Sequence, residues 1–209
     1  MNYQTKLTEY LLQIKAIKLD ITNPFTWASG WKSPIYCDNR KTLSYPVIRT
    51  YIRDAFVEII RDKFPRTEGI AGVATGAIGI GTLVADVLNL PFVYVRSKPK
   101  DHGLANMIEG EVVPNQKMVV VEDLVSTGKS SLNAVKALRE TGINVLGMTA
   151  IFTYDFQVAK DRFLEEDVLL YTLTDYSHLI DIAVHTGYVL PEHLDSLKEW
   201  RLNPEQWKK

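Results

Sequence analysis

Cysteine is almost absent from this sequence, which has Cys37 alone among its 209 residues. One cysteine excludes an intrachain disulfide and any zinc site built from several cysteines. The sequence also has no run of about twenty apolar residues that could cross a bilayer and no apolar signal-peptide stretch near its start. We therefore expect a cytoplasmic protein with no membrane partner.

The sequence also lacks an excess of charge of either sign. Its 24 Lys and Arg residues nearly balance 25 Asp and Glu residues, for a net charge of -1. A nucleic-acid partner would require a basic surface, so we expect small-molecule partners and no nucleic acid. The histidines His178, His185 and His193 do not have the spacing of metal ligands, and we expect no metal bound directly by protein side chains.

What is present is an ordinary globular composition, with 46% apolar residues and no repeat or linker. Segments of strand character alternate with segments of helical periodicity, which predicts an α/β fold with a mainly parallel central sheet flanked by helices. We expect a single domain over 1–209, with a small N-terminal hood over roughly 1–40 and a core over roughly 44–190.

Local patterns predict several elements of this fold. Apolar spacing favours one helix over 3–19, and an extended hairpin over 25–38 is expected to turn near Gly30. Ser44 and Asp175 are candidate N-caps of two further helices. Residues 97–114 have no periodicity and predict a long polar loop, which is typical either of a lid or of an unremarkable mobile segment.

The stretch 118–131, MVVVEDLVSTGKSS, is the most informative part of the sequence. An apolar strand leads into the two acids Glu122 and Asp123, and a small hydroxylated loop then leads into a helix over 132–138. The start of a helix directs free backbone N–H groups at its loop, which suits a phosphate. Ionised carboxylates beside that phosphate accept from hydroxyls and stabilise Mg²⁺ or a developing cation. A sugar phosphate offers all of these.

The glycine-containing segments partly match two nucleotide-binding motifs, but neither match is complete. A nucleotide-triphosphate loop would need glycine at the position of Asp123, whose carboxylate would repel phosphates. Gly76, Gly79 and Gly81 follow the dinucleotide fingerprint in reverse order. An ordinary strand-to-helix turn with solvated acids stays open on the stretch alone.

Several separated motifs resemble those of type I phosphoribosyltransferases. The segment VVVEDLVSTG over 119–128 is similar to the signature of that family. The segments RSKPKDHG over 96–103, FTWASG over 25–30 and KSP over 32–34 resemble the orotate phosphoribosyltransferases within it. These motifs occur in the expected order, and the resemblance runs over nearly the whole chain.

The resemblance implies an activity and a set of substrates. The expected reaction transfers the phosphoribosyl group of 5-phospho-α-D-ribose 1-diphosphate (PRPP) to orotate, giving orotidine 5'-phosphate and pyrophosphate in pyrimidine biosynthesis. Mg²⁺ would be the cofactor, carried mainly by the substrate. A homodimer is implied, in which the loop over 97–114 reaches into the site of the neighbouring subunit.

The resemblance also implies roles for particular residues. The catalytic residues would be Lys100, His102, Asp123 and Glu122. PRPP would be bound by Arg96, Lys100, His102, Glu122, Asp123, Leu124, Val125, Ser126, Thr127, Gly128, Lys129, Ser130, Thr75 and Gly76. The base would contact Ser126, with Arg40 or Lys32 as candidate partners of the orotate carboxylate, since planar pairing with a carboxylate favours Arg.

The sequence departs from the family pattern at four places. Ala28 and Gly76 stand where many relatives have lysine, no arginine follows Phe152, and Ser97 replaces a second lysine. Three of these departures remove cations from the base side. Two alternatives therefore stay open: a purine-type phosphoribosyltransferase, and a non-catalytic regulator that senses PRPP.

Overall fold

The protein is described by a computed structural model that covers residues 3–27, 29–98 and 107–208. Its centre is a six-stranded sheet in the order β10-β9-β8-β5-β6-β7. Neighbouring strands are parallel except β6 and β7, which are antiparallel. The mainly parallel α/β fold is thus confirmed. The strands are β5 (Gly69–Val73), β6 (Phe92–Val95), β7 (Ile108–Glu109), β8 (Lys117–Val125), β9 (Asn144–Thr153) and β10 (Leu170–Asp175).

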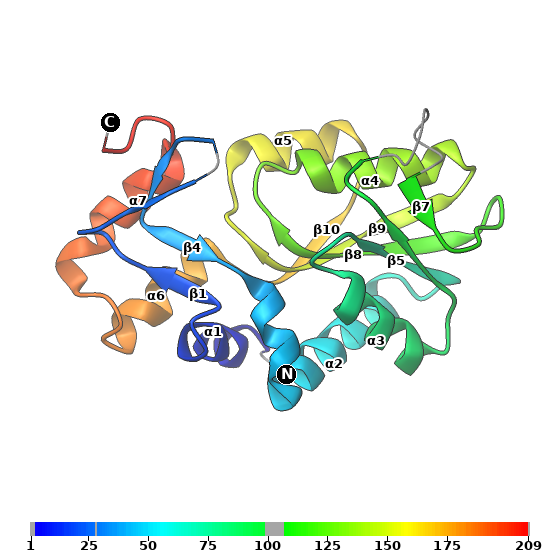
Figure 1. Cartoon of the computed structure of the whole chain (residues 1–209), viewed down its shortest axis with the longest axis horizontal. Coiled ribbons are helices and arrows are strands. Elements are labelled where there is room, and N and C mark those ends of the chain that lie inside the picture. The colour runs from blue at the N-terminus through cyan, green and yellow to red at the C-terminus, as the bar shows by residue number, and fades with distance from the viewer. Residues whose placement is uncertain (1–2, 28, 99–106, 209) are drawn as a thin grey trace.

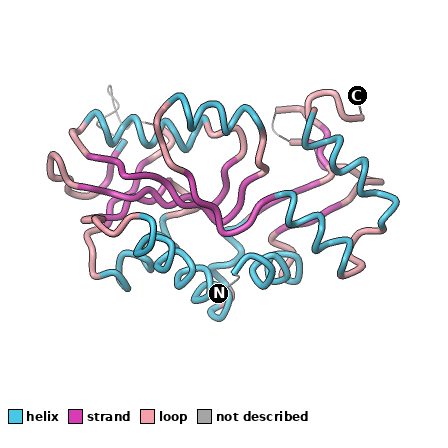
Figure 2. Tube along the Cα trace, turned by 180° about the vertical axis from the view of Figure 1, so that it is seen from behind, coloured by secondary structure: helices cyan, strands magenta, loops and turns pink. Residues whose placement is uncertain are grey.

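Helices cover both faces of this sheet, as Figures 1 and 2 show. The helices α4 and α5 lie on one face, and α1, α2 and α3 lie on the other. The inner strands are apolar because they are buried on both sides, as in β5, where every residue is buried. The helices are α1 (Tyr3–Gln13), α2 (Pro46–Lys63), α3 (Ile78–Leu88), α4 (Lys129–Glu140) and α5 (Gln157–Glu165).

A smaller lobe joins the two ends of the chain. It contains the antiparallel pairs β1 (Ile17–Leu19) with β4 (Ile35–Cys37) and β2 (Phe25–Thr26) with β3 (Lys32–Ser33). Figure 1 shows α6 (Tyr176–His185) and α7 (Leu194–Leu202) beside β1 and β4. The described residues also include the 3₁₀ helices η1 (Asn39–Ser44) and η3 (Pro191–His193). The C-terminal helices therefore pack with the N-terminal hood.

Aromatic packing holds this lobe together. The Trp200 side chain on α7 is fully buried, and its ring lies 5.5 Å from that of Trp27 and 5.8 Å from that of Tyr154, between centroids. Trp200 Nε1 donates a hydrogen bond to the backbone oxygen of Lys32 at 3.3 Å. Trp207, near the end of the chain, is also buried, so both tryptophans serve as packing anchors.

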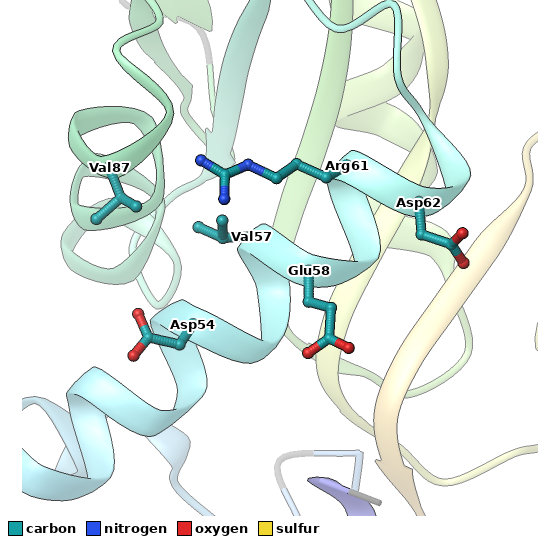
Figure 3. A pocket seen from close by; sticks show the side chains of 6 residues that line it. All are labelled: Asp54, Val57, Glu58, Arg61, Asp62 and Val87. Carbon is teal, nitrogen blue, oxygen red and sulfur yellow. The ribbon is translucent and has the colours of Figure 1, made fainter. Parts of the chain in front are cut away.

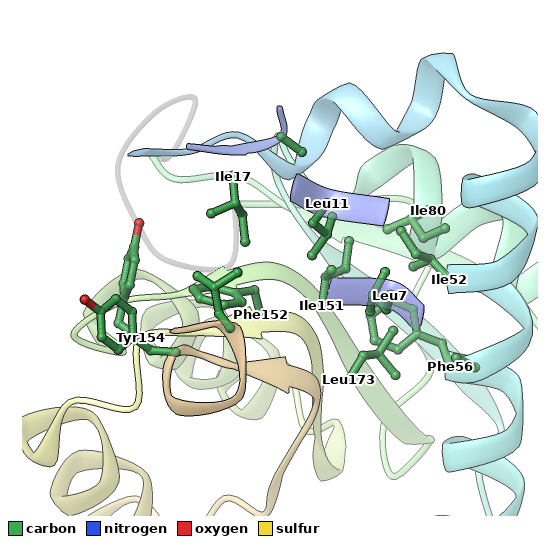
Figure 4. Packing of buried hydrophobic residues seen from close by; sticks show 14 of the residues in the cluster. Leu7, Leu11, Ile17, Ile52, Phe56, Ile80, Ile151, Phe152, Tyr154 and Leu173 are labelled. Atoms are coloured by element: carbon green, nitrogen blue, oxygen red, sulfur yellow. The ribbon is translucent and has the colours of Figure 1, made fainter. Parts of the chain in front are cut away.

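The larger apolar core lies between the sheet and the helices α1, α2 and α3. Figure 4 shows Leu7 and Leu11 of α1 against Ile151 and Leu173 of the sheet, with Ile52 and Phe56 reaching in from α2. Tyr154 lies at one end of this cluster, beside Phe152. The core thus extends from the sheet to the end of β9, where the aromatic packing begins.

Some local predictions are confirmed and others are wrong. Gly30 turns the predicted hairpin with a φ of 87°, and Asp175 caps α6 by accepting from the His178 N–H at 2.9 Å. The helix predicted over 3–19 ends at Gln13, because Ile17–Leu19 pairs with β4 instead. The expected Ser44 cap is absent, since Tyr45 is the N-cap of α2 and makes no side-chain cap bond.

The segment predicted as one long loop over 97–114 contains a short strand. β7 pairs with β6 through Tyr94 with Glu109 and Val95 with Ile108. Met107 is buried in the second apolar cluster, on the α4 side of the sheet. Two residues are too few to give a periodic signal in the sequence, so tertiary packing alone reveals this strand.

Candidate active site

The two acids at the end of β8 have different surroundings. The strand continues past both of them to Val125, so neighbouring side chains point to opposite faces. The Glu122 side chain is buried, and its carboxylate accepts from the Ser131 hydroxyl at 2.8 Å and from the Asp123 N–H at 3.0 Å. Burial, and secondly the charge of Asp123, raise the pKa of Glu122 well above its usual value. Glu122 therefore anchors the strand end to α4.

Asp123 is half-buried and lies against the turn that follows β5. A Cβ built on Gly76 would overlap the Asp123 carboxylate, so the two segments are in close contact. The Asn39 side chain of η1 donates to the backbone oxygen of Asp123 at 2.7 Å and is itself buried. This arrangement fixes one carboxylate at the carboxyl end of the sheet. It also explains why position 76 has no side chain.

The loop after β8 presents a row of unbonded backbone donors. Within the described ranges, the N–H groups of residues 126–131 donate no hydrogen bond to the protein. Gly128 takes a left-handed φ of 77° just before α4 begins at Lys129. Arg162 of α5 donates to the Thr127 backbone oxygen at 2.8 Å and supports the loop from behind. Free amides at a helix start form an anion site.

A second, shorter turn lies beside Asp123. The peptide between Ala74 and Thr75 is cis. In the part of the chain that the structure describes, the N–H groups of Thr75 and Gly76 also make no hydrogen bond to the protein, and α3 begins at Ile78. Asp123 thus stands between two groups of amides that can bind anions.

A pocket of about 410 Å³ opens next to Asp123, between the hood and the sheet. Aromatic rings and small polar groups make up its walls, and no Lys or Arg is among its lining residues in the described ranges. The lining residues are Thr26, Trp27, Ser29, Tyr36, Cys37, Leu124, Ser126 and Tyr154. Its size and flat rings suit a small heterocyclic base.

The cations expected near the base lie outside the pocket wall. Lys32 donates to the Thr26 hydroxyl at 3.0 Å, and Thr26 lines the cavity whereas Lys32 does not. Arg40 pairs with Asp38 at 2.7 Å, and its side chain is 60% exposed. The hydrogen bond from Arg40 lowers the pKa of Asp38. Either cation needs a side-chain rotation to reach the base.

The family resemblance predicts the cations Arg96, Lys100 and His102 for PRPP, and of these three the structure describes Arg96. Arg96 follows β6, and its guanidinium lies 3.4 Å from the Glu109 carboxylate on β7. Lys100 and His102 lie outside the described residues, as does the Ala28 position of the hood. The neighbouring strands β5 and β8 bring several predicted residues together at their carboxyl ends. These are Gly76 after β5, and Asp123, Ser126, Thr127, Gly128, Lys129 and Ser130 at and after the end of β8.

A larger hollow, of about 570 Å³, lies elsewhere, between α2 and α3. Figure 3 shows Asp54, Glu58 and Asp62 on α2 around it, with the Arg61 guanidinium directed toward Val87 on α3. Helix side chains form this hollow, and it lies apart from the carboxyl ends of the strands. We place the site at the strand ends because parallel sheets bind ligands there.

Sequence analysis missed several residues of the site. Asn39, Tyr36 and Cys37 line or support the pocket, and Arg162 supports the phosphate loop. The sequence has no local signal for these contacts, because each joins segments far apart in the chain. The family resemblance was the indication that the segment 25–38 belongs to a base site.

Comparisons with known proteins agree with this geometry. Residues 44–169 match the family model described as a phosphoribosyl transferase domain. The chain is 57% identical to an orotate phosphoribosyltransferase of Bacteroides fragilis, over 99% of this chain and 97% of that protein. It is 54% identical to one of Cytophaga hutchinsonii over the full length of both.

The chain belongs to the orotate phosphoribosyltransferase family. A solved orotate phosphoribosyltransferase of Aeropyrum pernix has the same fold, with a TM-score of 0.75 and 25% identity, over 88% of this chain and 99% of that one. Two of the segments that carried the resemblance meet at the base-sized pocket, through Thr26 and Trp27 of the hood and Leu124 and Ser126 after the acids. No described helix is long and apolar enough to cross a membrane.

Proposed function

We propose that this protein transfers the phosphoribosyl group of PRPP to orotate, releasing pyrophosphate and forming orotidine 5'-phosphate for pyrimidine synthesis. One observation carries the proposal: Asp123 stands between two sets of unbonded amides and next to a base-sized pocket. Two anion sites flanking one carboxylate suit a sugar with a phosphate at each end.

The 5'-phosphate is assigned to the loop after β8. Residues 124–130 would surround it, with the amides of Ser126 to Ser130 donating to its oxygens and Lys129 adding positive charge. The helix start of α4 supports this assignment because anions are stabilised there. Glu122 would not contact the phosphate and would act indirectly, by positioning Ser131 and Asp123 through its hydrogen bonds to them.

The ribose is assigned to Asp123, with Glu122 behind it. A carboxylate accepts hydrogen bonds from the ribose hydroxyls. Departure of pyrophosphate leaves positive charge on the sugar ring, as in glycoside cleavage. A fixed negative charge beside that ring stabilises the transition state more than the ground state.

The diphosphate is assigned to Thr75 and Gly76 on one side and to the loop after β6 on the other. Arg96, Lys100 and His102 would provide the positive charge, and His102 a hydrogen bond or proton to the leaving group. A loop that closes over the substrate also keeps water from the activated ribose. We propose a homodimer in which Lys100 and His102 act in the neighbouring subunit's site.

Mg²⁺ is proposed as a companion of PRPP. Within the described ranges, no three acidic, histidine or cysteine side chains come together to hold a metal. The oxygen-rich diphosphate is a preferred ligand of Mg²⁺, so the substrate would carry the ion. The ion would neutralise charge on the diphosphate that Asp123 alone would repel.

The base is assigned to the pocket between the hood and β8. Trp27 and Tyr36 offer ring faces, and Ser126 joins the base site to the phosphate loop. Arg40 and Lys32 remain the proposed cationic partners of the orotate carboxylate, since both border this region. Each would have to leave its present partner when orotate binds.

A turnover assay with a panel of bases tests the function. We expect pyrophosphate release from PRPP with orotate and none with adenine, guanine, hypoxanthine or xanthine. Release with a purine alone would support the purine-type alternative, and PRPP binding without turnover would support the regulator. Relatives named orotate phosphoribosyltransferases at 54% to 59% identity favour orotate.

A further inference from the structure

Tyr154 is the residue that forms the inner wall of the base pocket. It follows β9, and its side chain is 3% exposed. Its ring packs against Trp27, Phe156 and Trp200, with centroids 5.1, 5.5 and 5.8 Å away. The ring is thus held from several sides, and its hydroxyl has little freedom to move.

That hydroxyl makes no hydrogen bond within the described part of the chain, and its oxygen is not fully enclosed by protein atoms, since Tyr154 lines the cavity. The other polar ring groups of the same cluster are all satisfied. Trp27 Nε1 donates to the Ile35 oxygen at 3.1 Å, and Trp200 Nε1 to the Lys32 oxygen. Tyr176 Oη donates to the Leu197 oxygen at 3.1 Å. The Tyr154 hydroxyl differs from these three groups, because it is left available to a ligand in the cavity.

The next residue fixes the backbone that carries Tyr154. Asp155 has a left-handed φ of 58° and pairs with Lys160 at 2.9 Å and with Arg201 at 3.3 Å. Arg201 also donates to the Asp155 backbone oxygen. The Tyr154 N–H is bonded to the Val125 oxygen at 3.2 Å. The ring is therefore anchored to α5, α7 and β8 together.

The hydroxyl also stays protonated. Burial raises the pKa of Tyr154, and the nearby Cys37, Tyr36 and Asp123 act in the same direction. A protonated phenol is a hydrogen-bond donor. Asp123 of β8, which lies near it, is a carboxylate and offers no competing donor when ionised.

We propose that the Tyr154 hydroxyl is a specificity-determining donor for orotate, bonded to the carboxylate of the base. The assignment rests on the proposed function. No cation lines the described pocket wall, and a carboxylate inside it must still be hydrogen-bonded. A neutral donor paired with an ionised acceptor forms one of the stronger hydrogen bonds available to a binding site.

Tyr154→Phe tests the proposal because it removes the oxygen and keeps the ring. The KM for orotate should rise about tenfold to a hundredfold, which is the cost of one hydrogen bond to a charged group. The KM for PRPP should change less than about twofold, because no PRPP group is assigned to Tyr154. Without ligand, the variant's melting temperature should stay about the same, because the substitution removes no hydrogen bond within the described part of the protein.

Tyr176→Phe is the matched control. It removes a buried hydroxyl from the same aromatic cluster, but one that is already bonded to Leu197 and lies outside the pocket wall. It should lower the melting temperature and leave the KM for orotate unchanged. The two variants are expected to show opposite patterns of stability and orotate binding.

Two results would overturn the assignment while leaving the proposed function intact. One is an active Tyr154→Phe protein with an unchanged KM for orotate. The other is a parallel loss of stability and of affinity for both substrates, which would show a merely structural role. If the wild-type protein forms no orotidine 5'-phosphate, the proposed function fails, and this assignment fails with it.

Discussion

The phosphate side and the base side of the site are built in different ways. The phosphate side comes from two short contiguous segments, 74–77 and 126–131, each a turn that leads into a helix. The base side is assembled from the hood, the end of β8 and the residue after β9. Backbone donors dominate the first side, and side-chain rings dominate the second.

This difference determines how each side can change. A backbone amide is present whatever the side chain, so the phosphate side tolerates substitutions that keep the turn. The base side depends on side chains from distant segments, so individual substitutions can change which base is accepted. The missing lysines at positions 28 and 76 therefore remove base-side charge without disturbing the amides that face the phosphate.

Asp123→Asn is expected to have the largest effect on the phosphate side. The amide keeps the shape but not the charge, so kcat should fall roughly a hundredfold or more. The KM for orotate should change little, because we assign the carboxylate to the sugar and not to the base. Steady-state kinetics with both substrates measures the two effects. Asp161→Asn, an exposed change on α5, is the control and should leave kcat unchanged.

A mixture of inactive variants tests whether one site draws on two subunits. Lys100→Ala and Asp123→Asn proteins should each be nearly inactive alone. After subunit exchange at equal amounts, about a quarter of wild-type activity should return, because half the dimers are hybrids with one intact site. No recovery after exchange, verified with differently tagged subunits, would mean that Lys100 acts within its own subunit or that the dimer is wrong.

The contrast between the two sides also explains what could be predicted from sequence. The stretch 118–131 carries strand, acids, loop and helix in one continuous segment, so local pattern was enough to place a phosphate there. Its acids were expected to act as a pair, but only the backbone pleat and Ser131 reveal that Glu122 is buried behind Asp123. Local sequence contains no record of that burial.

The base pocket could be predicted only in part. The local pattern predicted a hairpin, and the family resemblance alone pointed to a base site and to orotate. The contribution of Tyr154 depends on packing against Trp27 and Trp200, residues 127 and 46 positions away in the sequence numbering. The helix predicted over 3–19 failed for a similar reason, since pairing of β1 with β4 outweighed helical periodicity.

Gly76→Ala should have an intermediate effect and tests the contact between the two phosphate-side segments. A methyl group at this position would overlap the Asp123 carboxylate and displace it. Misplacing a catalytic group by about 1 Å can cost about a hundredfold in rate, so we expect kcat to fall between tenfold and a hundredfold. Gly79→Ala, in the first turn of α3, is the control, because its added methyl group would meet only the flexible Leu43 side chain at 3.1 Å. It should retain kcat within about threefold of the wild type.

Glu122→Gln should have the smallest effect, seen in the pH dependence of stability. The pKa of Glu122 is raised on folding, so the folded state holds its proton to higher pH than the unfolded state. Stability from this group is complete below the unfolded value near 4.5 and is lost as pH rises through the folded pKa. Glutamine cannot titrate, so the variant's melting temperature should fall less steeply over this range, by on the order of a few degrees.

Glu68→Gln gives the opposite sign for comparison. Hydrogen bonds from the Lys117 backbone and side chain lower the pKa of Glu68 on the protein surface. Its stabilising effect is present above the unfolded pKa and is lost as pH falls through the folded one. Glu68→Gln should therefore weaken the pH dependence of the melting temperature at acidic pH. Glu122→Gln should weaken it at the higher pH values through which the folded protein loses the Glu122 proton. Identical pH profiles for the two variants would mean that the buried position of Glu122 behind Asp123 is wrong, and with it the unequal roles assigned to the two acids.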